Sequence, residues 1–169
     1  MKTIGWAALW LLMATPLWAA QGNIEVTSGT ATAQRLPLNV GAVLVRIAWL
    51  TDWGGATNGT LTVRLNARGT DPTPRGILQA IVARPNSGAE APTAGYRVRL
   101  SDEYGTLLTF DGPTTGSVLR WVPSGVAVAV DGTTSSLAGS LFVGGSLRLD
   151  VTDTSSSTGG LLDLYIAPR

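Results

Sequence analysis

The chain contains no cysteine and no histidine among its 169 residues. Without these residues a zinc site lacks its usual ligands, and haem ligation through histidine or cysteine is excluded. Catalysis by serine–histidine–aspartate or cysteine–histidine groups is excluded for the same reason. Disulfide bonds cannot brace the fold, so a hydrophobic core must hold it together. We therefore expect a protein that is not an enzyme and that binds no cofactor or metal ion.

Charged residues are also scarce, at 14% of the chain, and the only lysine is Lys2. A typical domain carries about 25% charged residues. The formal net charge is +1, and removal of residues 1–19 leaves 11 arginines against 11 acidic residues. A neutral domain without a basic run attracts nucleic acids and anionic membranes poorly, so we expect no nucleic-acid partner.

The N-terminus has the three parts of a secretory signal peptide. Lys2 supplies the positive charge, residues 4–13 form the apolar stretch, and small residues close it at Ala19. We expect residues 1–19 to be a signal peptide that is cleaved after Ala19, which would export the domain in a bacterial system. Two alternatives stay open. The segment is an uncleaved apolar anchor, with membrane contact only through residues 4–20, or a helix packed against a partner.

The remainder of the chain, residues 24–169, alternates apolar and polar residues in short runs separated by turn residues. Such alternation is typical of antiparallel sheets, and no convincing helix follows residue 23. We predict one all-β domain, an antiparallel β-sandwich of jelly-roll or immunoglobulin-like type with at least seven strands. The expected strands are Glu25–Ala33, Ala42–Leu50, Thr60–Asn66, Gly76–Ala83, Tyr96–Ser101, Thr106–Phe110, Val118–Val122, Val126–Val130, Ser146–Thr152 and Leu161–Ala167.

A compact group of charges lies in the stretch GYRVRLSDEYGTLLTF, which alternates, turns and alternates again. Arg97 and Arg99 are two residues apart, so both should point to the outer face of the sheet. Asp102 and Glu103 are adjacent, which does not suit a pair of catalytic carboxyl groups facing each other across a cleft. We interpret the group as a sheet surface with cross-strand arginine–carboxylate pairs, and retain Arg97 and Arg99 as candidate interaction residues.

The aromatic residues supply the other candidates. Trp49 alternates with Val45 and Ile47, which predicts a core position. Trp53 follows in a glycine-rich loop, where it is a candidate stacking platform for a sugar or a partner, or else folds back over the core. Trp121 is compatible with either place, and it is retained with Trp53 as a candidate interaction residue.

Residues 92–105, PTAGYRVRLSDEYG, resemble a pattern in small β-sandwich structural or accessory proteins of tailed-phage genomes. Residues 76–93 and 143–166 also resemble parts of that group, a strand with its following loop and a closing hairpin. The likeness covers residues 42–167 in the same order. It implies a role in a virion, as a head decoration, neck or tail component, and it supplies no catalytic residues.

Two functions follow as the main hypotheses, and an envelope enzyme built on carboxylates and arginines is a weaker third, because the chain lacks histidine and cysteine. The first is a non-enzymatic structural or accessory protein of a phage virion or phage-like assembly, which acts through self-association or contacts with other virion proteins. The second is an exported binding module of the periplasm or cell surface, which recognises a carbohydrate or an envelope partner.

Overall fold

The computed structural model describes residues 24–38, 41–54, 59–65, 75–92, 95–114, 116–122, 127–128, 134–135 and 141–167. Residues 1–19, the expected signal peptide or anchor, lie outside the described residues. Among the described ones, no helix has the length and apolar character that crossing a membrane requires. They form antiparallel strands and a short 3-10 helix, η2 at Gly88–Glu90, which confirms the predicted all-β class.

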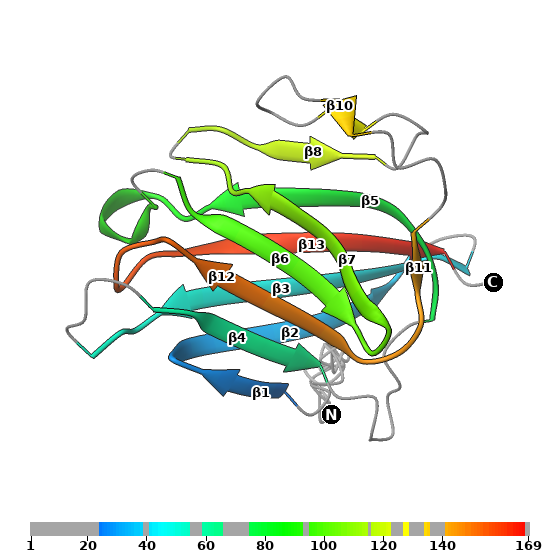
Figure 1. The fold of residues 1–169 in the computed structure, drawn as a ribbon, viewed down its shortest axis with the longest axis horizontal. Coiled ribbons are helices and arrows are strands. Elements are labelled where there is room, and N and C mark those ends of the chain that lie inside the picture. The colour runs from blue at the N-terminus through cyan, green and yellow to red at the C-terminus, as the bar shows by residue number, and fades with distance from the viewer. Residues whose placement is uncertain are drawn as a thin grey trace, which may run out of the picture.

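Two antiparallel sheets pack together as a sandwich (Figure 1). The five-stranded sheet, in front in Figure 1, has the order β1-β4-β12-β6-β7. The six-stranded sheet has the order β11-β5-β13-β3-β2, and β8 also pairs with β5. The strands are β1 (Ile24–Thr27), β2 (Gly29–Pro37), β3 (Val43–Thr51), β4 (Leu61–Leu65), β5 (Gly76–Pro85), β6 (Arg97–Asp102), β7 (Gly105–Asp111), β8 (Leu119–Trp121), β9 (Ala127–Val128), β10 (Thr134–Ser135), β11 (Phe142–Val143), β12 (Leu147–Thr152) and β13 (Gly159–Ala167).

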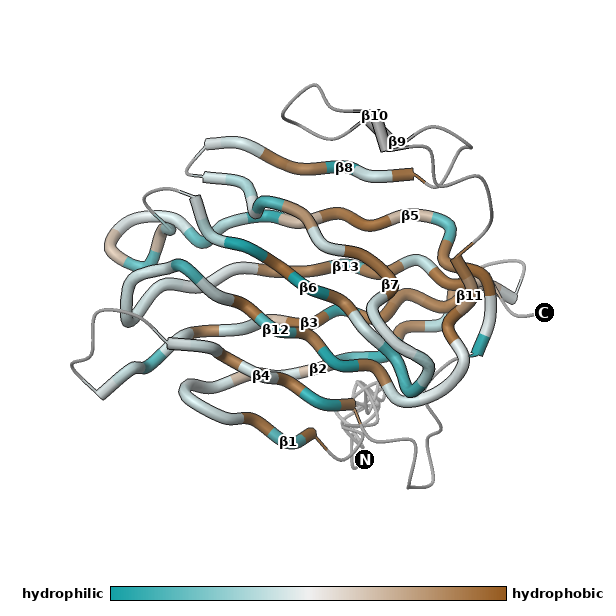
Figure 2. Tube along the Cα trace, viewed as in Figure 1, coloured by the Kyte–Doolittle hydropathy of each residue, from teal (hydrophilic) through white to brown (hydrophobic). Residues whose placement is uncertain are grey.

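Alternation along the strands builds the core between the sheets. Apolar and polar residues follow one another along β4, β6 and β12, whereas the six-stranded sheet is apolar over longer runs (Figure 2). Each buried leucine or valine stabilises the fold by about 1.5–3 kcal/mol relative to an exposed one. The residues predicted to face inward are buried as expected, which includes Leu61, Val63, Tyr96, Val98, Leu100, Leu147, Leu149, Val151, Leu162, Leu164 and Ile166.

The strand pairing follows a nested pattern. β6 pairs with the next strand, β7, and each earlier strand pairs with a progressively later one: β5 with β11, β4 with β12 and β3 with β13. Because of this nesting, the last two strands lie inside the sheets, with β12 between β4 and β6 and β13 between β3 and β5. In the six-stranded sheet β5 has β13 on one side and β8 and β11 on the other.

The first predicted strand, Glu25–Ala33, is two strands. The chain bends at Ser28 and Gly29, which have φ values of 63° and 148°, and it passes there from the five-stranded to the six-stranded sheet. Gly29 also lies too close to the Leu50 carbonyl oxygen to leave room for a Cβ atom. The alternation shifts by one residue at this bend, since Ile24 and Val26 face inward before it and Ala31 and Ala33 after it.

Other differences are confined to short elements. The predicted strand Val126–Val130 is described only at Ala127 and Val128, which pair with β10. Neither β10 nor β11 was expected from the sequence, because two residues are too few to show alternation. β11 nevertheless matters for packing, since Val143 is fully buried.

We predict that Gly112→Ala destabilises the domain by about 1–3 kcal/mol through overpacking. A Cβ atom at Gly112 would overlap the ring of Tyr96, which is 1% exposed and has its centroid 5.5 Å from that of Trp49. Denaturant unfolding checks this, with the exposed Thr109→Ala as control. The loss should shrink in a Tyr96→Leu background, and an equal loss in both backgrounds would contradict the steric explanation.

Candidate interaction site

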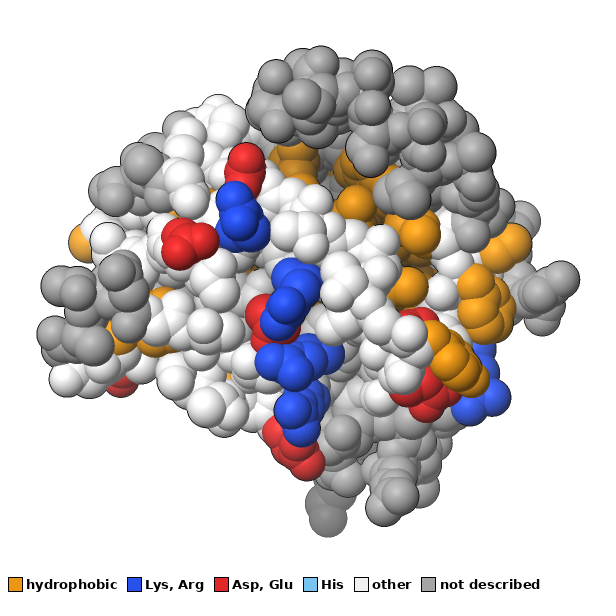
Figure 3. Space-filling model, viewed as in Figure 1, with side chains coloured by type: hydrophobic (Ala, Val, Ile, Leu, Met, Phe, Trp, Pro, Cys, Tyr) orange, Lys and Arg blue, Asp and Glu red, His pale blue; other side chains and the backbone are white. Residues whose placement is uncertain are grey.

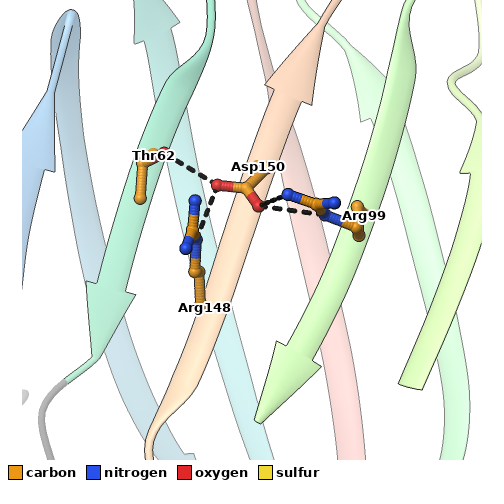
Figure 4. Close-up of polar contacts among 4 residues, drawn as sticks. All are labelled: Thr62, Arg99, Arg148 and Asp150. Atoms are coloured by element: carbon orange, nitrogen blue, oxygen red, sulfur yellow. Dashed lines mark hydrogen bonds and ion pairs between the residues drawn. The ribbon is translucent and has the colours of Figure 1, made fainter. Parts of the chain in front are cut away.

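One buried carboxylate organises the outer face of the five-stranded sheet. Asp150 is central on β12, and its side chain is 2% exposed. Its Oδ1 accepts hydrogen bonds from Thr62 Oγ1 at 2.7 Å and Arg148 Nε at 2.8 Å. Its Oδ2 accepts from Arg99 Nε at 3.1 Å and Nη2 at 2.8 Å (Figure 4). Three strands are therefore joined through one side chain.

The environment of Asp150 keeps it ionised. Burial acts to raise its pKa, but the hydrogen bonds from Thr62, Arg99 and Arg148 outweigh burial and hold the pKa below its ordinary value. Both arginines stay partly exposed, at 50% and 40% of their side chains, so water solvates the cationic side of the cluster.

A second buried carboxylate occupies the same kind of position on the six-stranded sheet. Asp163 on β13 has a fully buried side chain, and it accepts from Arg46 Nε at 2.7 Å and Nη2 at 3.0 Å. Arg84 on β5 donates from Nη1 at 2.8 Å. Burial acts to raise the pKa of Asp163, and the hydrogen bonds from Arg46 and Arg84 lower it below its ordinary value. The hydrogen bond with Asp163 raises the pKa of Arg46 in turn.

Sequence reasoning missed these two clusters. It placed Asp150 and Asp163 on the outer faces, which is correct, but it did not foresee their burial. One signal was present, since each is a single acid in the middle of an apolar strand. Their partners were not visible, because Arg99 and Arg46 lie 51 and 117 positions away along the chain.

The charged group around the β6–β7 turn does not gather at one point. Arg97 lies 3.7 Å from Asp111, and Arg99 bonds to Asp150, so the predicted cross-strand pairs form with other acids. Asp102 instead stabilises the turn, where its Oδ1 accepts from the Tyr104 amide at 2.9 Å and its Oδ2 from the Gly144 amide at 3.0 Å. The arrangement is that of a sheet surface.

Of the two alternatives for Trp53, the structure shows the second, in which the side chain folds back over the core. Its side chain is in the core at 8% exposure, and the indole Nε1 donates to the Thr154 carbonyl at 2.9 Å. Its backbone amide donates to Ser156 Oγ at 3.0 Å. The β12–β13 loop therefore holds Trp53 in place, and the indole cannot serve as an exposed stacking platform. Trp49 lies in the core as predicted.

Trp121 lies on β8, which pairs with β5 at one edge of the six-stranded sheet. On the same side of the sandwich, β7 is the edge strand of the five-stranded sheet. Trp121 and Leu119 on β8 are partly buried against the core, as is Phe110 on β7. Val118 and Val122, which flank β8, are 53% and 57% exposed. We call these five residues, with Leu107, the apolar side. Figure 3 shows apolar side chains along this side of the molecule.

The side chains of the apolar side carry no nucleophile and no titratable group. In the described part of the chain, no three histidine, cysteine, aspartate or glutamate side chains come together as a metal site. No protein-family model matches the chain, and a search of curated proteins finds no match to it. The site must therefore be judged from its own geometry.

We predict that Asp163→Asn lowers the free energy of unfolding at neutral pH by about 1–3 kcal/mol, since two arginines lose their partner. The arginines are partly exposed, which limits the loss. Because the folded-state pKa of Asp163 is lowered, its contribution is present above its unfolded pKa of about 3.9 and is lost as pH falls through the folded value. Urea unfolding across acidic and neutral pH measures both effects.

Asp111→Asn is the matched control, because its ion pair with Arg97 is exposed. We expect Asp163→Asn to flatten the fall of stability in acid, and Asp111→Asn to leave both neutral stability and acid dependence close to the parent. An Asp163→Asn protein with parental stability and parental acid dependence would contradict the role assigned to this carboxylate.

Proposed function

We propose that this chain is a non-enzymatic building block or accessory protein of a larger assembly, and that it acts through protein–protein contacts on the apolar side. The nested pairing of β3 with β13, β4 with β12, β5 with β11 and β6 with β7 supports a jelly-roll sandwich over an immunoglobulin-like one. Viral capsid proteins use jelly rolls, and so do lectins and cupins, so this support for a phage virion role is an analogy of fold.

The observation that carries the proposal is the composition of β8 and its flanks. Leu119 and Trp121 pair opposite Ala83 and Ile81, whose side chains belong to the core, so they face inward. By alternation, Val118, Arg120 and Val122 lie on the opposite face. Arg120 is the one charged residue among residues 118–122. An edge strand with exposed apolar residues at both of its ends is a common site of association.

The chemistry of this strand suits a protein partner. Within the described residues β8 pairs only with β5, and it contains no lysine or proline, the residues that usually protect an exposed edge. Trp121 is the type of large side chain that most often dominates binding energy at interfaces. The proposed partner is a second copy of the chain or another component of the same assembly.

The expected signal peptide or anchor at residues 1–19 concerns the location of the domain and is independent of the proposed contacts on the apolar side. A cleaved signal would place the domain in the periplasm or at the cell surface, where the alternative function is an exported module for a carbohydrate or an envelope partner. The burial of Trp53 removes the aromatic platform on which a sugar-stacking site would depend. Trp121 remains, but it lies among aliphatic side chains that favour a protein contact.

We predict that the purified chain associates at tens of micromolar and that Val122→Asp weakens this association at least about tenfold, since a charge would have to be desolvated at the contact. Light scattering over a concentration series gives the measurement. Thr32→Asp is the control, because Thr32 is exposed on β2 at the other edge of the same sheet.

Equal weakening by both variants would indicate a general charge effect and would refute the role of the apolar side. A parent that stays monomeric, and that binds no particle or envelope fraction, would leave the exported binding module as the better hypothesis. Thermal unfolding of each variant separates loss of association from loss of folding.

A further inference from the structure

The outer face of the five-stranded sheet differs in chemistry from the apolar side. Its residues on β1, β4, β12 and β6 are all polar, in contrast to the leucine- and valine-containing outer face of the six-stranded sheet. Figure 3 shows blue side chains gathered in a row across this face. We call Arg64 on β4, Arg148 on β12 and Arg99 on β6 the arginine row.

The row brings like charges together. Arg64 and Arg148 are directly opposite in the β4–β12 register, on strands that lie about 5 Å apart. Arg99 donates to Asp150 from β6, which lies on the other side of β12 from β4. Like charges directly opposite each other destabilise a sheet, and the two carboxylates that the register places beside the row, Asp150 and Glu25, are fewer than its three guanidinium groups. On the far side of Arg64 the register places Glu25, which has interactions of its own.

Much of the hydrogen-bonding capacity of the row is unused. A guanidinium has five N–H donors. Asp150 takes two of them from Arg99 and only the Nε donor from Arg148. Arg64 is exposed, and within the described part of the chain its side chain makes no hydrogen bond or ion pair. Asp150 thus orients two arginines while most of their terminal N–H groups remain available.

We infer that the arginine row binds the oxyanion groups of an acidic polysaccharide. Guanidinium forks match carboxylate and sulfate oxygens in pairs, and Asp150 holds two of them in place before a ligand arrives. The hydroxyl groups of Thr27, Thr62, Thr109 and Ser101 share this face and suit a hydrated sugar chain.

A protein partner fits this face less well. Interfaces between proteins usually depend on large apolar or aromatic anchors, and the described outer face of the five-stranded sheet carries none. A flat, hydroxyl-rich surface with a row of cations instead offers repeated weak contacts to an extended chain of anionic groups. The inference does not depend on the proposed assembly function, because the arginine row and the apolar side have no residue in common.

The test uses the full chain with four probes at low salt. Alginate presents carboxylates, heparin presents sulfates, dextran is the neutral polysaccharide, and poly-L-glutamate is the acidic polypeptide. We expect alginate or heparin to bind, dextran to fail, and poly-L-glutamate to bind at least about threefold more weakly. Binding should weaken further as salt shortens the Debye length from about 30 Å at 0.01 M to about 8 Å at 0.15 M.

Variants distinguish binding by the arginine row from a general effect of positive charge. Arg64→Gln leaves the Asp150 cluster intact and should weaken binding about threefold to tenfold, whereas Arg64→Lys should retain part of it. Arg120→Gln is the matched control, since Arg120 is an exposed arginine on β8 of the other sheet. Thermal unfolding verifies that each variant is folded.

Three results would overturn the inference. They are failure of both alginate and heparin to bind, an equal loss in Arg64→Gln and Arg120→Gln, and tighter binding of poly-L-glutamate than of either polysaccharide. The last result would assign the row to an acidic protein partner.

Discussion

The register of the two central strands is the constraint on which the sandwich depends. β12 and β13 each lie between two earlier strands, so a slip of either by one residue would turn its apolar side chains away from the core. The buried carboxylates of Asp150 and Asp163 oppose such a slip. In the observed register they meet Thr62 and Arg99 in one sheet and Arg46 in the other. In a slipped register Asp150 would lose Thr62 and Arg99 and keep only Arg148 of its own strand, and Asp163 would lose its cross-strand arginines, which is costly for a buried carboxylate.

The loop between these two strands extends the same constraint from one sheet to the other. Thr51 Oγ1 lies 2.9 Å from the carbonyl oxygens of Ser155 and Thr158, and all buried side-chain polar atoms of the described residues have a partner. Trp53 closes this end of the sandwich by donating to Thr154. A hydroxyl-rich loop that would be solvated in isolation is thus part of the interior, because Thr51 and Trp53 donate to its backbone carbonyls alongside its own Thr158 hydroxyl.

The sequence was sufficient for features that alternate locally, and insufficient for features that depend on pairing across the fold. Trp49 could be placed in the core because Val45 and Ile47 share its period. Trp53 could not, since its burial depends on Thr154, which lies 101 positions away. The same reason explains why Arg97 and Arg99 were assigned correctly to the outer face while their partners were not. The bend at Ser28 was missed because the phase shift that marks it is carried after the bend only by two small residues, Ala31 and Ala33.

The two proposed surfaces differ because the strands beneath them differ in position. β4, β12 and β6 are each paired with a strand on both sides, so their outer face is not an edge for association and can carry arginines in contact with water. A close contact between subunits on this face would remove that water from the arginines. β8 is short and pairs only with β5 within the described residues, so its side chains contribute to the core on one face and meet solvent on the other. Apolar residues there cost little stability in the folded domain and gain it when a partner covers them. An assembly formed through the apolar side would therefore leave the outer face of β4, β12 and β6 uncovered, with the arginine row accessible to an anionic chain.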